Sequence, residues 1–204
     1  MANLKNNVDD IYSKEFNSVE QSNSVYNQWH NYDQQVIEQG NWTGHSMGAS
    51  YVIWNYNPDV RVCDLGCGTG AVGKLLYWAN YKNTYGFDIS QTMIMQAEGF
   101  YKELHMIDIC EEPYPGLYDV VTAIGVFTKG HLDSKPLKNL AESLVSKGKL
   151  CVTTPLMIDG YDYEKEAGWN DQPYFKKISE KPFDSWREDG KQYQHNFCVW
   201  EKTS

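Results

Sequence analysis

The chain has 204 residues, with 27 acidic and 18 basic side chains and a formal net charge of −9. This length favours a single domain, and the acidic excess argues against surfaces for nucleic acid or anionic membranes. We find no apolar run near the roughly 18 residues of a membrane span, and the first residues lack the apolar core of a signal peptide. We therefore expect a cytoplasmic protein, a monomer or homodimer, without nucleic-acid or membrane partners.

The cysteines and histidines give no metal-binding pattern. The five cysteines include no Cys-x-x-Cys pair, and the five histidines are scattered along the chain. Zinc sites need clustered ligands at short spacings. We predict no metal site and cysteines that remain as free thiols.

The first 54 residues predict a mostly helical segment that covers the rest of the domain. Apolar and aromatic side chains from Val25 to Ile37 recur at helical spacing, which predicts one helix there. The glycines of Gly40–Gly48 predict a loop, and Ala49–Trp54 predicts the end of a second helix.

Residues 59–153 alternate between strand-like and helix-like patterns, which indicates an α/β domain with a mostly parallel sheet. Helices are expected at Val72–Tyr81 and after Ser90, which would be an N-cap. A further helix is expected around Leu137–Leu144, with Gly148 just past the end of that helix. Strands are expected at Val60–Leu65, Tyr85–Asp88, His105–Ile109, Tyr118–Ile124 and Leu150–Thr153.

Residues 154–204 break this rhythm. The stretch after Pro155 shows no helical face, and its side chains allow two interpretations. They predict either an acceptor-binding loop or a solvated loop with some packed rings. The aromatic residues concerned are Tyr161, Tyr163, Trp169 and Tyr174. Two later runs, Phe183–Trp186 and Tyr193–Trp200, are joined by a short link and predict an antiparallel hairpin.

The glycine-rich stretch that begins at Asp64 follows the first strand and precedes a helix, where a ligand binds in open α/β sheets. Two interpretations compete. Gly68-Thr-Gly70-Ala-Val-Gly73, with Asp88 twenty residues after Gly68, matches the dinucleotide pattern and would indicate an NAD-dependent oxidoreductase. The earlier frame, Asp64-x-Gly66-x-Gly68-x-Gly70, resembles motif I of the class I S-adenosylmethionine-dependent methyltransferases. We favour the second, because an acidic residue at the strand end would repel a pyrophosphate and suits the ammonium of a methionine group.

The resemblance extends over roughly residues 25–201. Val25–Asp33 is similar to the opening of many small methyltransferases, Tyr85–Ser90 to motif II and Met106–Ile109 to the third-strand motif. Gly125–Leu132 resembles the Williams–Beuren-region methyltransferase-like proteins. The resemblance implies one domain over 1–204, with a cover at 1–54, a cofactor-binding core at 59–153 and an acceptor loop and hairpin at 154–204. It also implies a three-layer Rossmann-like fold with a mostly parallel seven-stranded sheet and a C-terminal antiparallel strand.

The resemblance further implies S-adenosylmethionine as cofactor and S-adenosylhomocysteine as product. In the family, the acidic residue corresponding to Asp88 accepts the ribose hydroxyls, Ile89 covers the adenine and Asp108 bonds the adenine amino group. The whole implied cofactor site is Tyr26, Trp29, Asp64, Gly66, Cys67, Gly68, Gly70, Asp88, Ile89, Asp108, Ile109 and Gly125.

Methyl transfer from a sulfonium needs alignment, exclusion of water and sometimes a base. Histidine is the usual base near neutral pH, so His131, His45 and His30 are candidates, each with the alternative of a purely structural role. We expect a small-molecule acceptor methylated at O, N or S. A protein that binds S-adenosylmethionine without turnover is the remaining alternative to the methyltransferase and the oxidoreductase.

Overall fold

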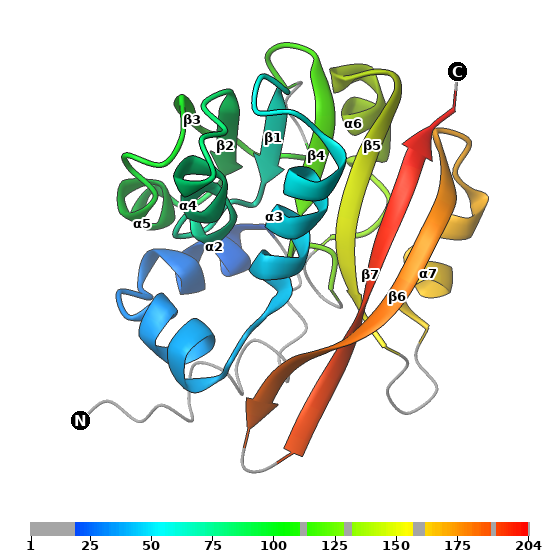
Figure 1. The fold of residues 1–204 in the computed structure, drawn as a ribbon. Coiled ribbons are helices and arrows are strands. Elements are labelled where there is room, and N and C mark those ends of the chain that lie inside the picture. The colour runs from blue at the N-terminus through cyan, green and yellow to red at the C-terminus, as the bar shows by residue number, and fades with distance from the viewer. Residues whose placement is uncertain (1–18, 111–113, 129–131, 157–161, 189–190, 204) are drawn as a thin grey trace.

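The computed structural model describes residues 19–110, 114–128, 132–156, 162–188 and 191–203 (Figure 1). Seven strands form one sheet in the order β3-β2-β1-β4-β5-β7-β6. Neighbouring strands from β3 to β5 pair in parallel, whereas β7 is antiparallel to both β5 and β6. This confirms the predicted fold class. The strands are β1 (Val62–Leu65), β2 (Thr84–Asp88), β3 (Glu103–Met106), β4 (Tyr118–Ala123), β5 (Leu144–Pro155), β6 (Phe175–Glu188) and β7 (Lys191–Lys202).

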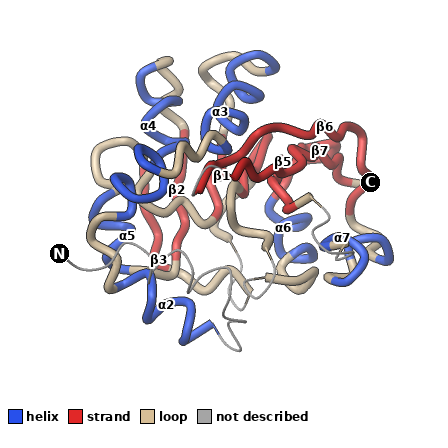
Figure 2. The backbone as a smooth tube through the Cα atoms, turned by 90° about the horizontal axis from the view of Figure 1, so that it is seen from below, coloured by secondary structure: helices blue, strands red, loops and turns tan. Residues whose placement is uncertain are grey.

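Helices cover both faces of this sheet. Seen along the strands, α3 and α4 lie on one face and α6 and α7 on the other, which gives three layers (Figure 2). The helical elements are α2 (Val19–Asn27), the π-helix η1 (Asp33–Gln39), α3 (Gly44–Asn55), α4 (Ala71–Trp78), α5 (Gln91–Gln96), α6 (Leu137–Ser143), α7 (Tyr163–Glu166) and the 3₁₀ turn η2 (Trp169–Asp171).

The central strands are apolar on both sides, as expected for a parallel sheet between two helical layers. On β1, Val62 packs in the cluster that contains Val52 of α3 and Leu76 of α4. Its neighbours Cys63 and Leu65 pack in the opposite cluster with the α6 side chains. All four residues of β1 are buried. Because successive side chains point to opposite faces of a strand, they pack against the helices on both faces of the sheet.

The N-terminal segment differs from its prediction. The continuous helix expected from Val25 to Ile37 is wrong, because α2 ends at Asn27 and η1 begins at Asp33. The break brings the Trp29 ring edge-on to Tyr32, with centroids 4.9 Å apart, and buries it against Met93 of α5. Burial of the indole, whose Nε1 donates to Gln35 Oε1, accounts for the loss of the regular helix.

The glycine-rich loop expected over residues 40–48 is also partly wrong, because α3 begins at Gly44. A Cβ on Gly48 would come within 2.8 Å of Ile124 Cγ1. We attribute the glycine to this close approach between the helix and the end of β4. In the sequence alone, Gly48 is typical of a loop, but in the structure it allows α3 to pack closely against the sheet.

Three core predictions need adjustment. The helix expected over Val72–Tyr81 ends at Trp78. The third strand, expected at His105–Ile109, is Glu103–Met106, so it begins two residues and ends three residues earlier. Gly148 does not terminate a helix: α6 ends at Ser143 and Gly148 lies within β5. The pairing of β5 with β4 is irregular there, because Leu144 pairs with Tyr118 and Lys149 already with Val120.

The C-terminal hairpin is confirmed and extends well beyond the predicted runs, since β6 and β7 contain 14 and 12 residues. The segment after Pro155, for which no helix was expected, contains α7 and η2. None of the helices in the described ranges is both long and apolar enough to cross a bilayer.

Candidate functional site

The loop after β1 adopts the backbone conformation that its glycines suggest. Gly66, Gly68 and Gly70 have φ angles of +61°, +55° and +87°, a region that L side chains rarely occupy. The loop turns back so that the Cys67 N–H donates to the Phe87 carbonyl on β2. A ligand can therefore approach the loop backbone without interference from a Cβ at these glycines.

Asp88, at the end of β2, is bonded directly to this loop. Its Oδ2 accepts from the Gly68 N–H at 2.8 Å and its Oδ1 from the Ser90 N–H at 2.9 Å. Ser90 is the N-cap of α5, as predicted, with its hydroxyl accepting from the Met93 N–H. Burial raises the pKa of Asp88, and the backbone donors partly oppose that rise. Asp88 thus organises the loop and remains partly exposed toward the space beside it.

A cavity of about 130 Å³ lies at this edge of the sheet, where the parallel strands end. Its walls come from the loops after β1, β2, β3 and β4 and from the N-terminal segment. Eight of the predicted cofactor residues line it: Tyr26, Gly66, Gly68, Asp88, Ile89, Asp108, Ile109 and Gly125. We call it the main cavity.

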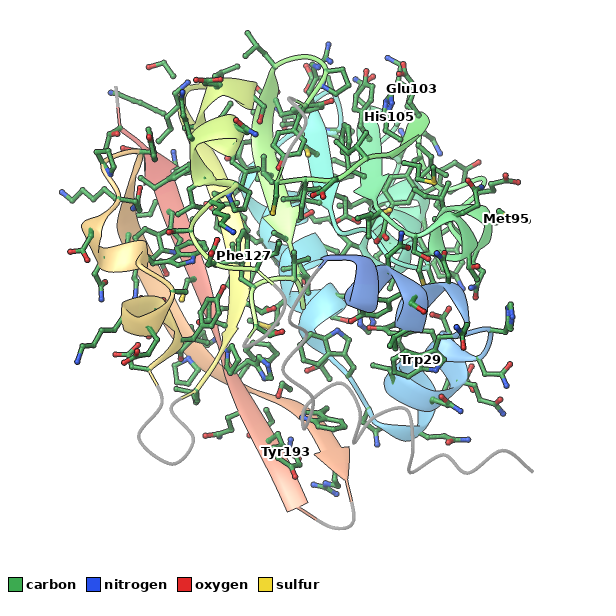
Figure 3. The ribbon with its side chains drawn as sticks, turned by 180° about the vertical axis from the view of Figure 1, so that it is seen from behind. Trp29, Met95, Glu103, His105, Phe127 and Tyr193 are labelled. Carbon is green, nitrogen blue, oxygen red and sulfur yellow. The ribbon has the colours of Figure 1, made fainter. Side chains whose placement is uncertain are left out.

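A smaller cavity of about 50 Å³ adjoins the first, and Tyr32, Gly66, Gly68 and Ile124 line both. Asp64, Cys67 and His45 also line this side cavity. Asp64 and Cys67 thus lie beside the main cavity rather than in its wall. The predicted residues Gly70 and Trp29 line neither space: Gly70 is the N-cap of α4, and Trp29 is buried inside the N-terminal segment (Figure 3).

Asp64 is the most deeply buried carboxylate of the site, with 2% of the residue exposed. Its Oδ1 accepts from the Thr122 hydroxyl at 2.7 Å and its Oδ2 from the Tyr101 hydroxyl at 2.6 Å. Burial raises the pKa of Asp64 to about 6, although both hydrogen bonds oppose the shift. Within the described part of the chain, no lysine or arginine neutralises this carboxylate. A cationic ligand group in the side cavity would supply the missing charge.

The three candidate histidines are placed very differently. His45 lies in the first turn of α3, in the wall of the side cavity, and its Nδ1 is buried with no hydrogen-bond partner among the described residues. Burial lowers the pKa of His45, and nearby Asp33 opposes this only in part, so the ring is neutral at pH 7. His30 is exposed and lines neither cavity. His131 lies outside the described residues.

Several contacts that no sequence motif indicated hold the N-terminal segment over the site. Asn27 Oδ1 accepts from the Ser90 hydroxyl at 2.7 Å. The Thr69 hydroxyl, in the glycine loop, donates to Asp33 of η1. These pairs are 63 and 36 residues apart, and single polar residues at such separations carry no periodic signal.

The surroundings of Gly73 do not match the dinucleotide interpretation of Gly68–Gly73. In that pattern the third glycine allows close helix–strand packing next to a pyrophosphate. Here a Cβ on Gly73 would come within 2.5 Å of Tyr101 Cε1 and of its hydroxyl. Gly73 therefore makes room for a tyrosine ring, and this accounts for the third glycine without a dinucleotide.

The aromatic residues expected to form an acceptor loop are mainly core residues. Tyr163 and Trp169 are almost fully buried, and Trp169 packs edge-on against Phe127, with centroids 4.8 Å apart. Tyr174 packs against the same core cluster. Phe127, in the segment that follows β4, is fully buried and is labelled in Figure 3. Tyr163 and Trp169 are therefore not available as walls of an acceptor site, and Tyr161 lies outside the described residues.

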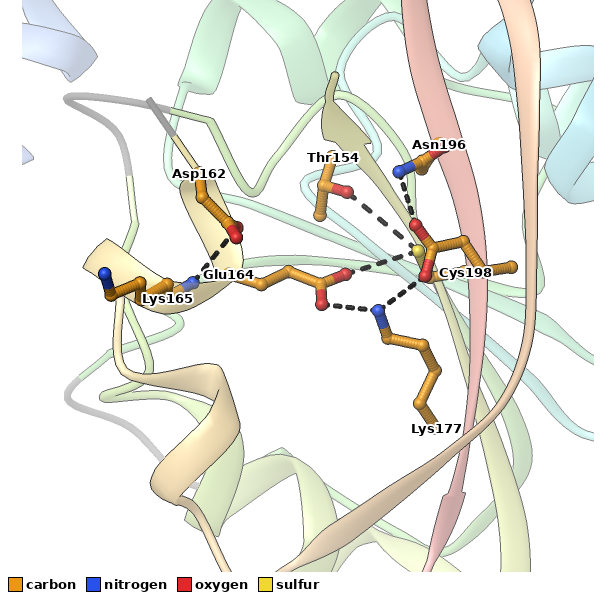
Figure 4. Close-up of polar contacts among 8 residues, drawn as sticks. Thr154, Asp162, Glu164, Lys165, Lys177, Asn196 and Cys198 are labelled. Atoms are coloured by element: carbon orange, nitrogen blue, oxygen red, sulfur yellow. Dashed lines mark hydrogen bonds and ion pairs between the residues drawn. The ribbon is translucent and has the colours of Figure 1, made fainter. Parts of the chain in front are cut away.

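Glu164, in the same segment, belongs to a polar cluster with Glu180, Cys198 and Lys177 (Figure 4). Three side chains of metal-ligating type, two carboxylates and a thiol, meet there, but the Lys177 ammonium bonds both carboxylates. A fixed cation already occupies the position that a metal would need. We interpret the cluster as an internal ion pair that fastens α7 to β6.

The sheet order, the glycine loop after β1 and the acidic residues at the ends of β1 and β2 together define a class I S-adenosylmethionine-dependent methyltransferase. The chain belongs to the methyltransferase domain family, whose model matches residues 56–197. It is similar to methyltransferase-like protein 27 from Homo sapiens, with 32% identity over 113 residues. That match covers 52% of this chain and 44% of the relative, so the chain matches less than half of the length of that relative.

Solved structures show the same fold. Magnesium protoporphyrin IX methyltransferase from Synechocystis PCC 6803, with bound S-adenosylmethionine, has a TM-score of 0.61 at 18% identity, covering 100% of this chain and 99% of that one. A putative RNA methyltransferase from Pyrococcus horikoshii has a TM-score of 0.60 at 12% identity, covering 78% and 86%. Both structures share the fold of this chain, and their differing titles leave the type of acceptor open.

Proposed function

We propose that this protein transfers the methyl group of S-adenosylmethionine to an O, N or S atom of a small molecule, with S-adenosylhomocysteine as product. The observation that carries this proposal is the main cavity, because eight residues chosen from sequence motifs scattered between positions 26 and 125 line one space. Such convergence at the carboxyl ends of parallel strands is the usual mark of a ligand site in an open α/β sheet.

The chain's own groups fit this cofactor. Asp88 and Asp108 supply carboxylate oxygens to the main cavity for the ribose and the adenine, and Ile89 and Ile109 supply apolar walls. Asp64 supplies a buried negative charge in the adjoining side cavity, suited to the ammonium of the methionine part. The His45 Nδ1, which has no hydrogen-bond partner in the described ranges, lies in the same side cavity. The two joined cavities therefore match a nucleoside and an amino-acid end.

The cofactor supplies an activated methyl group, so the protein's task is to align the acceptor, exclude water and, for a protonated acceptor, remove a proton. His45 is the described histidine best placed for the last step, because burial keeps it neutral and the side cavity joins the main one. We assign it the role of general base. Its ring would accept the acceptor's proton as the new bond to the methyl group forms.

Two features favour a small acceptor, and the cysteines bear on the compartment. Tyr26, Tyr32 and Leu132 wall the main cavity from the N-terminal segment and the β4–α6 connection, which suits a compact molecule. A net charge of −9 opposes a nucleic-acid backbone. The five cysteines are free thiols, as expected in the reducing cytoplasm, where we place the reaction.

Isothermal titration calorimetry with S-adenosylmethionine and S-adenosylhomocysteine tests the cofactor site, with NADH as a control ligand. Saturable binding of the first two and none of NADH is expected; the reverse would refute the proposal. Incubation with methyl-labelled cofactor and either a metabolite extract or purified RNA then tests the acceptor. Label in small molecules supports the proposal, label in RNA contradicts the acceptor class, and binding without any transfer indicates a non-catalytic binding protein.

A further inference from the structure

Tyr101 is a residue to which no sequence motif assigns a role, and its ring fills a gap left by the glycines of the site. It lies between α5 and β3. A Cβ on Gly73 would clash with the ring, and one on Gly86 or Gly70 would come within 3.1 or 3.2 Å of it. The ring thus lies against the first turn of α4 and strand β2 and cannot tilt freely.

The packing places the Tyr101 hydroxyl between a donor and an acceptor. It accepts from the Gly73 N–H at 3.2 Å and donates to Asp64 Oδ2 at 2.6 Å. Gly73 is the third residue of α4, and the N–H groups of a helix's first turn have no partner within the helix. The positive end of the helix therefore polarises the hydroxyl toward the carboxylate.

Asp64 depends on this donor because few other groups stabilise its charge. Thr122 provides the second hydroxyl, at 2.7 Å. The other titratable groups near Asp64 are neutral thiols or further acid: Cys63 on β1, Cys67 in the loop and Asp88 on β2. None of them favours the ionised form. His45 lines the same side cavity and is neutral at pH 7.

We propose that Tyr101 is a positioning residue of the cofactor site, whose hydroxyl keeps the Asp64 carboxylate ionised and fixed so that it can receive the ammonium group of the ligand. This inference rests on the proposed function, since it needs a ligand that carries a cationic amine. It assigns Gly73 a role as well, because a Cβ there would come within 2.2 Å of Tyr101 Cζ.

The test measures ligand affinity against pH, from pH 5.5 to 8.5, for the parent chain and Tyr101→Phe. The variant keeps the ring and removes the hydroxyl. With S-adenosylmethionine we expect about tenfold weaker binding at pH 7, and the pH at which affinity reaches half its maximum should rise by about one unit. Binding should recover partly at pH 8.5, where Asp64 is ionised again.

Two further measurements separate this role from general damage to the fold. 5′-Methylthioadenosine has the nucleoside but no ammonium, so Tyr101→Phe should leave its affinity unchanged. Thr122→Val should reproduce the pH shift through the other Asp64 oxygen, whereas Thr122→Ser, which keeps the hydroxyl, should restore the parent profile. Tyr118→Phe is the matched control, because that buried phenol bonds the Pro115 carbonyl far from Asp64.

The outcomes are distinguishable. If the parent chain binds neither S-adenosylmethionine nor 5′-methylthioadenosine, the proposed function fails. If the parent binds both and Tyr101→Phe weakens them equally, or leaves the pH profile in place, the function stands and the role of Tyr101 is refuted. A selective loss for the amine-bearing ligand, with a shifted profile, supports it.

Discussion

Replacing Asp64 by asparagine should make the ligand-free protein more stable and its cofactor binding weaker. Asp64 is buried, and its partners are the Thr122 and Tyr101 hydroxyls. A buried carboxylate without a cation is costly to keep ionised. Asparagine has nearly the same shape and can still bond both hydroxyls, with its amide donating to one and its oxygen accepting from the other.

The pKa of Asp64 sets the size of this effect. Burial raises it from 3.8 to about 6 in the folded protein, so the folded state binds the proton more tightly than the unfolded state. Stability therefore falls as pH rises from about 4 to about 6, and the cost is constant above that range. The shift corresponds to at most about 3 kcal/mol. Rearranged hydrogen bonds in the variant reduce this, so we expect a gain of about 1–2 kcal/mol at pH 8.

Urea denaturation of the parent and Asp64→Asn at pH 4.5, 6 and 8 measures the difference, and calorimetry at pH 8 measures cofactor affinity. The expected result is no stability difference at pH 4.5, a growing advantage of the variant toward pH 8, and at least tenfold weaker binding. A variant that is less stable than the parent at pH 8 would refute the reasoning. Asp119→Asn is the control, because that carboxylate bonds the Arg61 N–H at the opposite end of the sheet.

Three further variants probe other parts of the molecule. Asp88→Ala should weaken S-adenosylmethionine binding by at least about tenfold, because it removes an acceptor for the Gly68 N–H as well as a ligand contact; an unchanged calorimetric affinity would contradict the site. His45→Gln should lower the single-turnover methyl-transfer rate by about 100-fold with little change in cofactor affinity, and an unaltered rate would remove its role as base. Lys177→Met leaves Glu164 without its cation, so the free energy of unfolding by urea should fall by about 2 kcal/mol, whereas a change in cofactor affinity would show that the cluster is coupled to the site.

The sheet could be predicted because its signals are local. Each buried strand is a short apolar run, and the glycine loop with Asp64 and Asp88 lies between two of them. Such features depend only on residues that are close in the sequence, so they can be recognised from a single sequence. The short apolar runs also predicted the antiparallel hairpin. Its strands continue through charged residues whose pairing depends on the neighbouring strand, β7 for β6 and β5 for β7, and not on their own pattern.

The N-terminal segment could not be predicted, because its conformation is decided by distant partners. Trp29 leaves the helical pattern in order to pack on Met93, 64 positions later in the chain. Gly44 and Gly48 look like loop residues until Trp42 and Ile124 are found in the space that their side chains would occupy. The aromatic residues after Pro155 allowed two interpretations for the same reason, since composition cannot distinguish a ring in a ligand cavity from one in the core.

Gly73, in the first turn of α4, shows that the same sequence pattern can arise for two different physical reasons. In a dinucleotide fold the third glycine serves helix–strand packing beside a pyrophosphate, whereas here Gly73 leaves room for the ring of Tyr101. The choice between these meanings depends on a residue 28 positions away. That tyrosine helps to stabilise a buried charge which the fold alone leaves uncompensated. A ligand that carries the complementary charge should therefore bind the folded state more tightly. At equal ligand concentration, the thermal midpoint should rise more with S-adenosylmethionine than with 5′-methylthioadenosine.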